Sequence, residues 1–320
     1  MSFVGGGSDL PAYYQEEEGA VLSTTINKYM YVTLNKKFDG NIRLSYSKTE
    51  EVANVNKIEH PLVRHCLNLM KIKGGVEIAS MADIPSQGSG LGSSSSYTVG
   101  LLHALYAYKN RYVSKNKLAE LACHIEIDLC REPIGKQDQY AAAHGGLNLI
   151  RFHPNKLVTI DPVICNQKTY NDLDSHIILF YTGITRSASG ILMEQSKKMV
   201  DSNKRKLMRR MVEIAFEIKK TIESNNLDPI GEMLNENWLL KSQMASRITT
   251  AKIDDWYRRG IKAGALGGKL LGAGNGGFLM FFAKPENHRL IINELSDLKH
   301  VEISFESNGT QIIFYQPNAD

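Results

Sequence analysis

The sequence of 320 residues contains only four cysteines, and none of them forms a CxxC pair. Thiols this few and scattered exclude a disulfide scaffold, and the lack of a CxxC pair argues against a structural zinc site. We therefore expect the chain to reside in a reducing compartment, the cytoplasm. The four are Cys66, Cys123, Cys130 and Cys165.

Long hydrophobic runs and strong net charge are lacking as well. No apolar stretch approaches the roughly 20 residues of a transmembrane helix, and the first residues show no basic segment followed by a hydrophobic one. The formal charge of +4 is small for this length, which suits a small anionic ligand better than a nucleic acid. We expect neither a membrane nor a nucleic-acid partner. One basic stretch, KRKLMRR at 204–210, is either a solvated helix face or an anion site.

The apolar content, 42%, is sufficient for two domains with separate cores. Strand patterns occur in both halves, and residues 187–262 carry an almost continuous helical pattern. This succession indicates an α+β fold rather than a doubly wound parallel sheet. The aperiodic stretch 155–176 predicts domains 1–170 and 171–320. Strands are expected at 20–38, 41–47, 74–84, 145–152, 175–183, 272–283, 300–306 and 310–316, and helices at 60–72, up to about 110, 114–132 (N-capped by Ser114) and 286–296.

The stretch DIPSQGSGLGSSSSYTVGLLHAL, residues 83–105, joins a glycine- and serine-rich loop to an apolar helix. Glycines let main-chain N–H groups converge, and the start of a helix adds its unpaired N–H groups and the positive end of its dipole. The combination predicts an anion cradle, with a plain flexible linker as the alternative. No lysine follows the glycines and GxGxxG is absent, so neither a Walker A loop nor a dinucleotide fingerprint applies.

Two acidic residues follow in the segment IEIDLCREPIGKQDQYAAAHGG, residues 125–146. On a helical wheel Glu126 flanks the apolar stripe of its helix, where a carboxylate is costly unless it is paired or metal-bound. Asp138 is expected in a short loop before a small-residue turn, either as a catalytic group or as the N-cap of the next few residues.

Glycine-rich turns stand near both ends of the chain. In FVGGGSDLPAYY, Asp9 can accept two hydroxyl groups, and Gly5, Gly6 and Gly7 let a ligand approach the backbone. In GAGNGG, residues 272–277, Asn275 tolerates left-handed φ. This second turn either contacts a ligand or serves only a tight bend into the following strand.

Three segments resemble in order and spacing the three motifs of the GHMP kinases: FVGGGSDLPAYY, PSQGSGLGSSSSY and the segment around GAGNGG. Together they span nearly the whole chain. The resemblance implies a two-domain fold with an N-terminal domain like domain 2 of ribosomal protein S5 and a ferredoxin-like C-terminal domain. Within that family the segments EPIGKQDQYAAAHGGLN and YTGITRSASGIL are most similar to sugar kinases of the D-glycero-D-manno-heptose 7-phosphate type.

The resemblance assigns roles to residues. Asp138 becomes the catalytic base, Asp9 a sugar ligand, and Ser94 and Glu126 ligands of Mg²⁺. The loop implied to hold the phosphates of ATP comprises Pro85, Gly88, Gly90, Leu91, Gly92, Ser93, Ser94, Ser95 and Ser96, and the implied sugar site comprises Gly6, Gly7, Ser8, Asp9, Arg186, Gly274 and Asn275.

The first motif departs from the family in one respect. Related sugar kinases carry an arginine five residues before the first glycine, a position that falls just before Met1 here. A clipped chain, a misplaced start or replacement by another cation, Lys136, would each account for it. A missing N-terminal strand would also leave a sheet edge unpaired.

The expected activity is therefore ATP- and Mg²⁺-dependent phosphorylation of the anomeric hydroxyl of D-glycero-D-manno-heptose 7-phosphate. A kinase of an unphosphorylated sugar, such as L-fucose or galactose, and a sugar sensor without turnover remain alternatives. A decarboxylase of the mevalonate diphosphate type is disfavoured because the middle segment resembles a sugar kinase.

A phosphorylated sugar needs a second anion site, and TGITRSASGIL offers one at Arg186, with Ser187 and Ser189 beside it. Arg186→Ala should therefore weaken binding of a sugar phosphate far more than binding of ATP, as measured by calorimetric titration of each ligand. Equal losses for both ligands would contradict this role.

Overall fold

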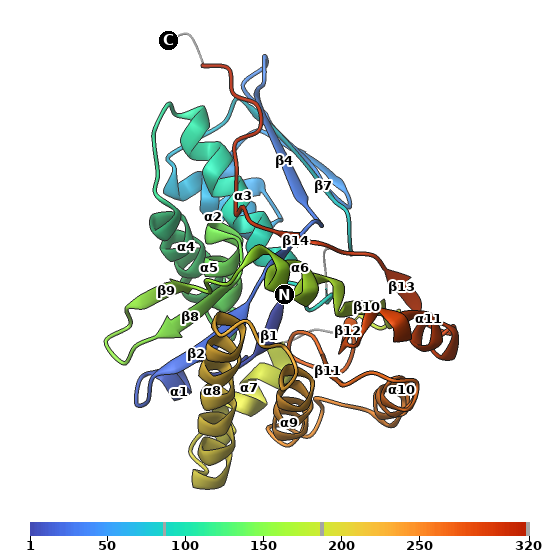
Figure 1. Cartoon of the computed structure of the whole chain (residues 1–320). Coiled ribbons are helices and arrows are strands. Elements are labelled where there is room, and N and C mark those ends of the chain that lie inside the picture. The colour runs from blue at the N-terminus through green and yellow to red at the C-terminus, as the bar shows by residue number, and fades with distance from the viewer. Residues whose placement is uncertain (86–87, 186–188, 318–320) are drawn as a thin grey trace. The chain divides into compact units, whose positions relative to one another are not determined.

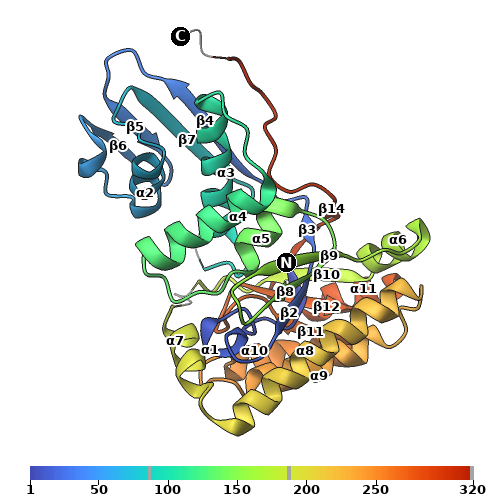
Figure 2. The same cartoon turned by 90° about the vertical axis from the view of Figure 1, so that its left-hand side faces the viewer.

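The computed structural model describes residues 1–85, 88–185 and 189–317. The chain forms two compact units, each built from separate segments (Figures 1 and 2). Unit 1 comprises residues 1–27, 87–91 and 146–307, and unit 2 comprises residues 28–86, 92–145 and 308–320. The sequence predicts one boundary, at residue 170, between two continuous domains, whereas each unit combines separate segments of the chain. The boundary at residue 170 stays a prediction.

Unit 1 contains two four-stranded sheets and one two-stranded sheet. The first sheet has the order β1-β2-β8-β9 and is antiparallel throughout. Its edge strand β1 lies just before the first glycine motif and pairs with β2. The strands are β1 (Ser2–Val4), β2 (Gly19–Ser23), β8 (Asn148–Phe152) and β9 (Val158–Pro162), and β3 (Thr25–Ile26) pairs with β14 (Phe305–Glu306).

The second sheet of unit 1 has the order β11-β12-β10-β13, again antiparallel. Counted along the chain from β10, this is the order 2-3-1-4, with helices after the first and third strands, as in the split βαβ arrangement of ferredoxin-like domains. The C-terminal prediction is therefore confirmed. The strands are β10 (Ile177–Tyr181), β11 (Gly267–Leu270), β12 (Phe278–Phe282) and β13 (Lys299–Val301).

Helices cover these sheets because their apolar faces need partners. Within unit 1, α8 packs against β1, β2 and β8, and α9 packs against β11 and β12, with α8 and α9 side by side (Figure 2). The helices are α1 (Pro11–Tyr14), α6 (Gln167–Ser175), α7 (Ser189–Lys198), α8 (Ser202–Glu223), α9 (Ile230–Ser242), α10 (Ala251–Lys262) and α11 (Pro285–Glu294).

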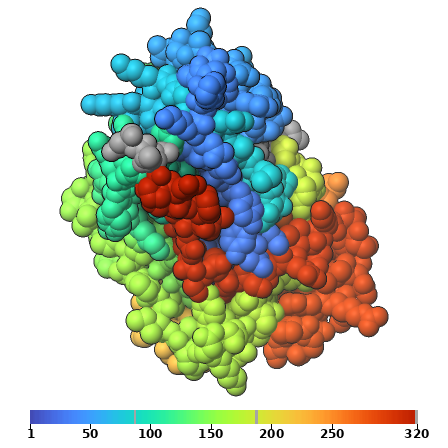
Figure 3. Space-filling view, turned by 90° about the horizontal axis from the view of Figure 1, so that it is seen from above, coloured from blue at the N-terminus to red at the C-terminus, as the bar shows by residue number. Residues whose placement is uncertain are grey.

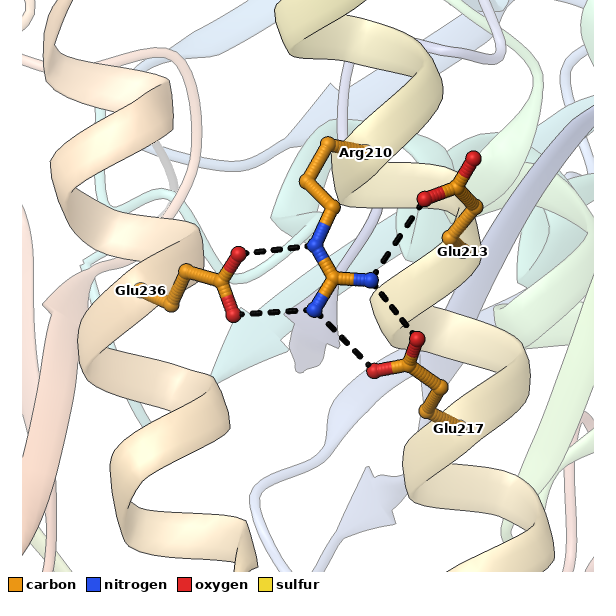
Figure 4. Close-up of polar contacts among 4 residues, drawn as sticks. All are labelled: Arg210, Glu213, Glu217 and Glu236. Carbon is orange, nitrogen blue, oxygen red and sulfur yellow. Dashed lines mark hydrogen bonds and ion pairs between the residues drawn. The ribbon is translucent and has the colours of Figure 1, made fainter.

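The arginines of the basic stretch at 204–210 pair with carboxylates, Arg205 with Glu16 at 2.9 Å. Arg210 on α8 donates to Glu236 on α9 at 2.7 and 3.0 Å, to Glu217 at 2.6 and 3.2 Å, and to Glu213 at 3.4 Å (Figure 4). Arg209 pairs with Glu17 at 2.8 Å. The stretch is thus a charged helix face, as one of the two sequence interpretations holds, and its arginines are committed to internal pairs.

Unit 2 is built on the sheet β4-β7-β5-β6, in which β5 and β7 run parallel. Helix α3 packs against β4. The elements are β4 (Met30–Lys36), β5 (Ile42–Ser45), β6 (Thr49–Val52), the 3₁₀-helix η1 (Val55–Lys57), α2 (Pro61–Leu69), β7 (Val76–Ala82), α3 (Ser93–Tyr108), α4 (Lys115–Cys123), the π-helix η2 (His124–Leu129) and α5 (Gln137–His144).

The C-terminal segment was predicted as a strand at 310–316, and this is wrong. Residues 311–317 have no regular structure and lie on the surface of unit 2, in dark red in Figure 3. Thr310 N–H bonds to Ala142 O at 2.9 Å, and Tyr315 OH donates to Asn110 at 2.7 Å. These loop and helix contacts replace a strand ladder, and Ile313 and Phe314 are each 82% exposed.

Replacing Arg210 by Met should lower the free energy of unfolding by about 1 kcal/mol, because a networked but half-exposed arginine contributes more than an isolated surface pair. Urea denaturation at low and high salt measures this, and the loss should shrink at high salt. Glu213→Gln is the control, since that carboxylate makes only the 3.4 Å contact and is 53% exposed. A control loss as large as that of Arg210→Met would contradict the network.

Candidate active site

The glycine loop of the second motif ends at the start of α3. Gly88, Gly90 and Gly92 all have left-handed φ, at +63°, +77° and +72°, and Gly92 is the N-cap. The backbone ladder of α3 begins with the bond from Ser96 N–H to Gly92 O at 2.9 Å. The N–H groups of the residues before Ser96 lie ahead of this ladder, at the N-terminus of the helix. N–H groups at such a terminus can bind a phosphate.

The third motif packs directly on this loop. A Cβ on Gly272 would lie 2.5 Å from Gly90 Cα, and one on Gly277 would lie 2.4 Å from Ser89 O. Only glycine permits such approach of two backbones. The glycines of the third motif therefore have a packing role that the sequence did not predict, since within unit 1 its turn supports the loop.

Glu126 is the central polar group of unit 2, and it is only 1% exposed. Its Oε1 accepts from Ser94 Oγ at 2.7 Å, and its Oε2 accepts from Ser95 Oγ at 2.8 Å and from Gln139 Nε2 at 2.5 Å. Burial raises the pKa of the Glu126 carboxyl, and the bonds from Ser94, Ser95 and Gln139 oppose that rise because they favour the ionised form.

The π-helix explains how Glu126 comes to be buried. An α-helix would leave it at the flank of the apolar stripe, but residues 124–129 form the wider turn η2, with the bond from Cys130 N–H to Ile125 O at 2.8 Å closing the end. In the wider turn Ile125 and Glu126 are both buried, and Leu129 is 38% exposed. Such π turns occur most often at functional sites.

Asp138 lies in the first turn of helix α5, so its prediction in a loop is wrong. Because α5 begins at Gln137, Asp138 and Gln139 share a helix, and their side chains point to different neighbours. The exposed Asp138 carboxylate lies beside the α3 N-cap, since a Cβ on Gly92 would be 3.1 Å from Asp138 Cγ. Lys136, half-buried, is the N-cap of α5.

The remaining loop residues differ in exposure. Ser93 and Ser95 are buried, and Ser93 Oγ donates to Pro85 O at 3.3 Å. Ser94 is exposed although its hydroxyl reaches Glu126, whereas Leu91 and Ser96 are half-buried. Ser94, at the start of α3, is thus exposed to solvent and at the same time bonded to the buried carboxylate.

The first motif forms a tight turn in unit 1. Gly5 and Gly7 have left-handed φ of +85° and +105°, and Asp9, 2% exposed, accepts the Gly7 N–H on Oδ1 at 3.0 Å. Ser8 both donates to and accepts from the Ala20 backbone at 3.1 Å, which makes it a tie between the turn and β2. Gly6, half-buried, presents its carbonyl to the Nζ of Lys241 at 2.8 Å.

Asn275 adopts left-handed φ, +62°, as predicted, and its N–H bonds to Ile248 O at 2.9 Å. Gly274 packs on the same backbone, with its would-be Cβ 2.6 Å from Ile248 Cα. Arg186 lies outside the described residues.

The structure thus brings Ser94, Glu126 and Asp138 together within unit 2, and Gly6, Gly7, Ser8 and Asp9 within unit 1. Sequence reasoning missed Gln139, and also Lys241 and Gln195 beneath the first motif. A signal existed for Lys241, since it follows Ile230, Leu234 and Trp238 at spacings of four, four and three on the apolar face of α9. Among the described residues, no three His, Cys, Asp or Glu side chains converge as a ready metal site. In that same part of the chain, no helix combines the length and apolarity needed to cross a membrane.

Comparison with known proteins identifies the family. The family model described as GHMP kinases N terminal domain matches residues 53–146, and that of GHMP kinases C terminal matches residues 218–299. Together they cover more than half of the chain. The chain belongs to the GHMP kinase family and is a phosphotransferase with an alcohol group as acceptor, so the predicted family, fold class and enzyme class are confirmed.

Particular relatives narrow this class. D-glycero-alpha-D-manno-heptose 7-phosphate kinase of Campylobacter jejuni is 29% identical in an alignment 307 residues long, which covers 92% of this chain and 90% of that protein. Among solved structures, a D-glycero-D-manno-heptose 1-phosphate kinase from Bacteroides thetaiotaomicron has a TM-score of 0.79 at 24% identity, covering 97% and 94% of the two chains. Lactococcus lactis galactokinase has a TM-score of 0.74 at 19% identity, covering 96% and 92%. At these identities the two structures show the fold.

Glu126→Gln should lower the free energy of unfolding by about 1–3 kcal/mol, because an amide N–H₂ would face a hydroxyl or amide donor inside the core. Urea denaturation measures the loss. The control is Glu120→Gln on α4, whose carboxylate is 54% exposed and pairs with Lys117 at 3.3 Å; its effect should stay within about 0.5 kcal/mol. If Glu126→Gln had the same free energy of unfolding as the wild type, the stabilising role of the buried, hydrogen-bonded carboxylate would be contradicted.

Proposed function

We propose that this protein phosphorylates the anomeric hydroxyl of D-glycero-D-manno-heptose 7-phosphate with ATP, giving the 1,7-bisphosphate and ADP. The observation that carries the proposal is the arrangement at the start of α3, where Ser94 bonds to Glu126 and Asp138 lies against Gly92. The extent of the match to the 7-phosphate kinase of Campylobacter jejuni supports the choice of sugar.

The proposed nucleotide site is the loop from Pro85 to Ser96. Its backbone amides and the N-terminal end of the α3 dipole would hold the β- and γ-phosphates. This requires no lysine in the loop, which agrees with the sequence. Phosphate charge is instead balanced by helix and backbone dipoles, together with Lys136 at the N-cap of α5.

Mg²⁺ would be held by Ser94 and Glu126. A hydroxyl and a carboxylate oxygen are the hard oxygen donors that this ion prefers, and one or two protein ligands suffice when phosphates and water supply the rest. The two side chains are already in contact at 2.7 Å, with Ser94 facing solvent, so the donor set fits the ion. When bound, the ion would neutralise charge on the phosphate oxygens.

Asp138 would act as the catalytic base. Its carboxylate accepts the proton of the anomeric hydroxyl, whose oxygen forms a bond to the γ-phosphorus while the bond to the β-phosphate oxygen breaks and ADP leaves. Asp9 would hold the sugar through its hydroxyl groups, and Gly274 and Asn275 would border the same acceptor site. The exposure of Asp138 suits this role, because it leaves the carboxylate within reach of a substrate hydroxyl.

The proposed location is the cytoplasm. All four cysteines are free thiols, with Cys66 and Cys123 buried and Cys130 and Cys165 partly exposed. Free thiols near the surface are typical of a reducing compartment.

The test measures ADP release across a panel of heptose 7-phosphate, heptose 1-phosphate, galactose and L-fucose. The expected result is highest kcat/KM with heptose 7-phosphate and at least about a 10²-fold loss of kcat in Asp138→Asn, since general-base catalysis typically contributes this much. Asp128→Asn is the control, because Asp128 lies on the same helical segment as Glu126 but is exposed and pairs with His124 at 2.8 Å. Sugar binding without ADP release would instead identify a sensor, and unchanged turnover in Asp138→Asn would remove the base.

A further inference from the structure

A buried lysine lies directly beneath the turn of the first motif. Lys241 on α9 is 6% exposed, and its Nζ donates to Gly6 O at 2.8 Å and to Gln195 Oε1 of α7 at 3.1 Å. Lysine is rarely buried to this extent without a purpose, because desolvating its charge is costly. Here the buried lysine donates a hydrogen bond to Gly6 O, in the turn that carries Asp9.

Two buried amides surround this lysine, and the orientation of each is fixed. Gln195 is fully buried and gives Oε1 to Lys241, so its Nε2 points the other way, beside Gly7. Asn237, 1% exposed, gives Oδ1 to Gly5 N–H at 3.4 Å. Neither Gln195 Nε2 nor Asn237 Nδ2 has an acceptor among the described residues.

Flipping either amide would lose the bond that it makes now, so the two N–H₂ groups are true donors. A cluster that only held the fold together would satisfy such groups internally. Both nitrogens are buried, so an oxygen such as that of an ordered water would complete the cluster. The cluster bonds directly to the Gly5–Asp9 turn, which carries Asp9, the proposed sugar ligand.

We propose that Lys241 is a positioning residue of the acceptor-sugar site: in its charged form it fixes the Gly5–Asp9 turn so that the Asp9 carboxylate meets the sugar hydroxyls. The inference rests on the proposed sugar-kinase function and names a group that acts through Asp9 and never touches the transferred phosphate. Binding of the acceptor sugar should therefore depend on Lys241, and binding of the nucleotide should not.

Titration of Lys241 supplies a signature that a merely structural lysine lacks. Burial lowers its pKa to about 8, and the opposing attraction of Asp9 limits that fall. Among the described groups packed around it from the first-motif turn, α7 and α9, Asp9 is the charged neighbour; Gln195 and Asn237 are neutral. Above pH 8 the lysine becomes neutral and its bonds to Gly6 and Gln195 weaken. The KM for the sugar should then rise between pH 7 and pH 9, while the KM for ATP stays flat.

The first variant is Lys241→Met, which keeps the length and removes the charge. We expect about a tenfold or greater rise in sugar KM at pH 7, less than a twofold change in ATP KM, and loss of the rise between pH 7 and pH 9. Lys220→Met is the matched control, since Lys220 is exposed on α8. An unchanged pH profile in Lys241→Met, or equal rises in both KM values, would overturn the proposal.

The second variant is Gln195→Glu, which keeps the acceptor oxygen and places a carboxylate beside Lys241. The carboxylate favours the charged lysine, so the midpoint of the sugar-KM profile should move up by about one pH unit or more. A midpoint that does not move overturns the proposal even if Lys241→Met fails to fold.

Melting temperature gives a readout independent of activity. A lysine whose pKa is near 8 when folded and 10.5 when unfolded binds fewer protons in the folded state between these values, so wild-type stability should rise with pH across this window relative to Lys241→Met. Absence of that relative rise would show that Lys241 does not titrate as required.

These outcomes are distinct from failure of the proposed function. If the wild type phosphorylates another sugar, only the proposed identity of the substrate is wrong. The same KM profiles are then measured with that sugar. If the wild type neither binds nor phosphorylates any sugar of the panel, the Gly5–Asp9 turn is no acceptor site and the role of Lys241 falls with it.

Discussion

The hydrogen bonds to the buried Glu126 carboxylate are the interaction on which the rest of the site depends. They join three elements, since Ser94 and Ser95 open α3, Glu126 lies on η2, and Gln139 lies on α5. A carboxylate in a low-dielectric interior holds its donors more strongly than it would in water. The N-terminus of α3 and the start of α5, which carries Asp138, are therefore fixed to one point in unit 2.

Unit 1 uses the same physical principle with the opposite charge. There a buried ammonium donates to the carbonyl of a glycine turn, as in unit 2 a buried carboxylate accepts from the serines at the start of α3. In both places the glycines supply backbone shape, and the buried charge prevents that flexible backbone from sampling other shapes.

Much of the fold follows from the sequence because its patterns are local. The alternation at 145–152 and 175–183, the cap at Ser114 and the left-handed turn at Asn275 each depend on residues next to one another in the chain, and each was predicted correctly. The strand predicted at 310–316 failed because a strand also needs a free sheet edge, which no local pattern reports. Strand β11 was missed because Gly267 and Gly268 have low strand propensity and are tolerated only by close packing, Gly267 on Gly231 and Gly268 on Phe281.

The candidate site was predictable to a similar depth. Ser94, Glu126 and Asp138 were predicted from their segments and from the family resemblance, and their roles stay predictions. Gln139 was not predicted as a partner, because its contact with Glu126 exists only once η2 and α5 are folded. The helical wheel placed Glu126 at the flank of its helix since it assumed 3.6 residues per turn, and the wider π turn changed that phase.

That wider turn makes chain length at 124–129 a property of the site in its own right. A π turn accommodates one residue more than an α-helical turn, so loss of a single residue there would restore an ordinary helix and rotate everything on one side by about 100°. The hydrophobic composition of the segment would hardly change, yet the acid would leave the serines that it holds. Spacing, as much as residue identity, is therefore what this stretch of chain encodes.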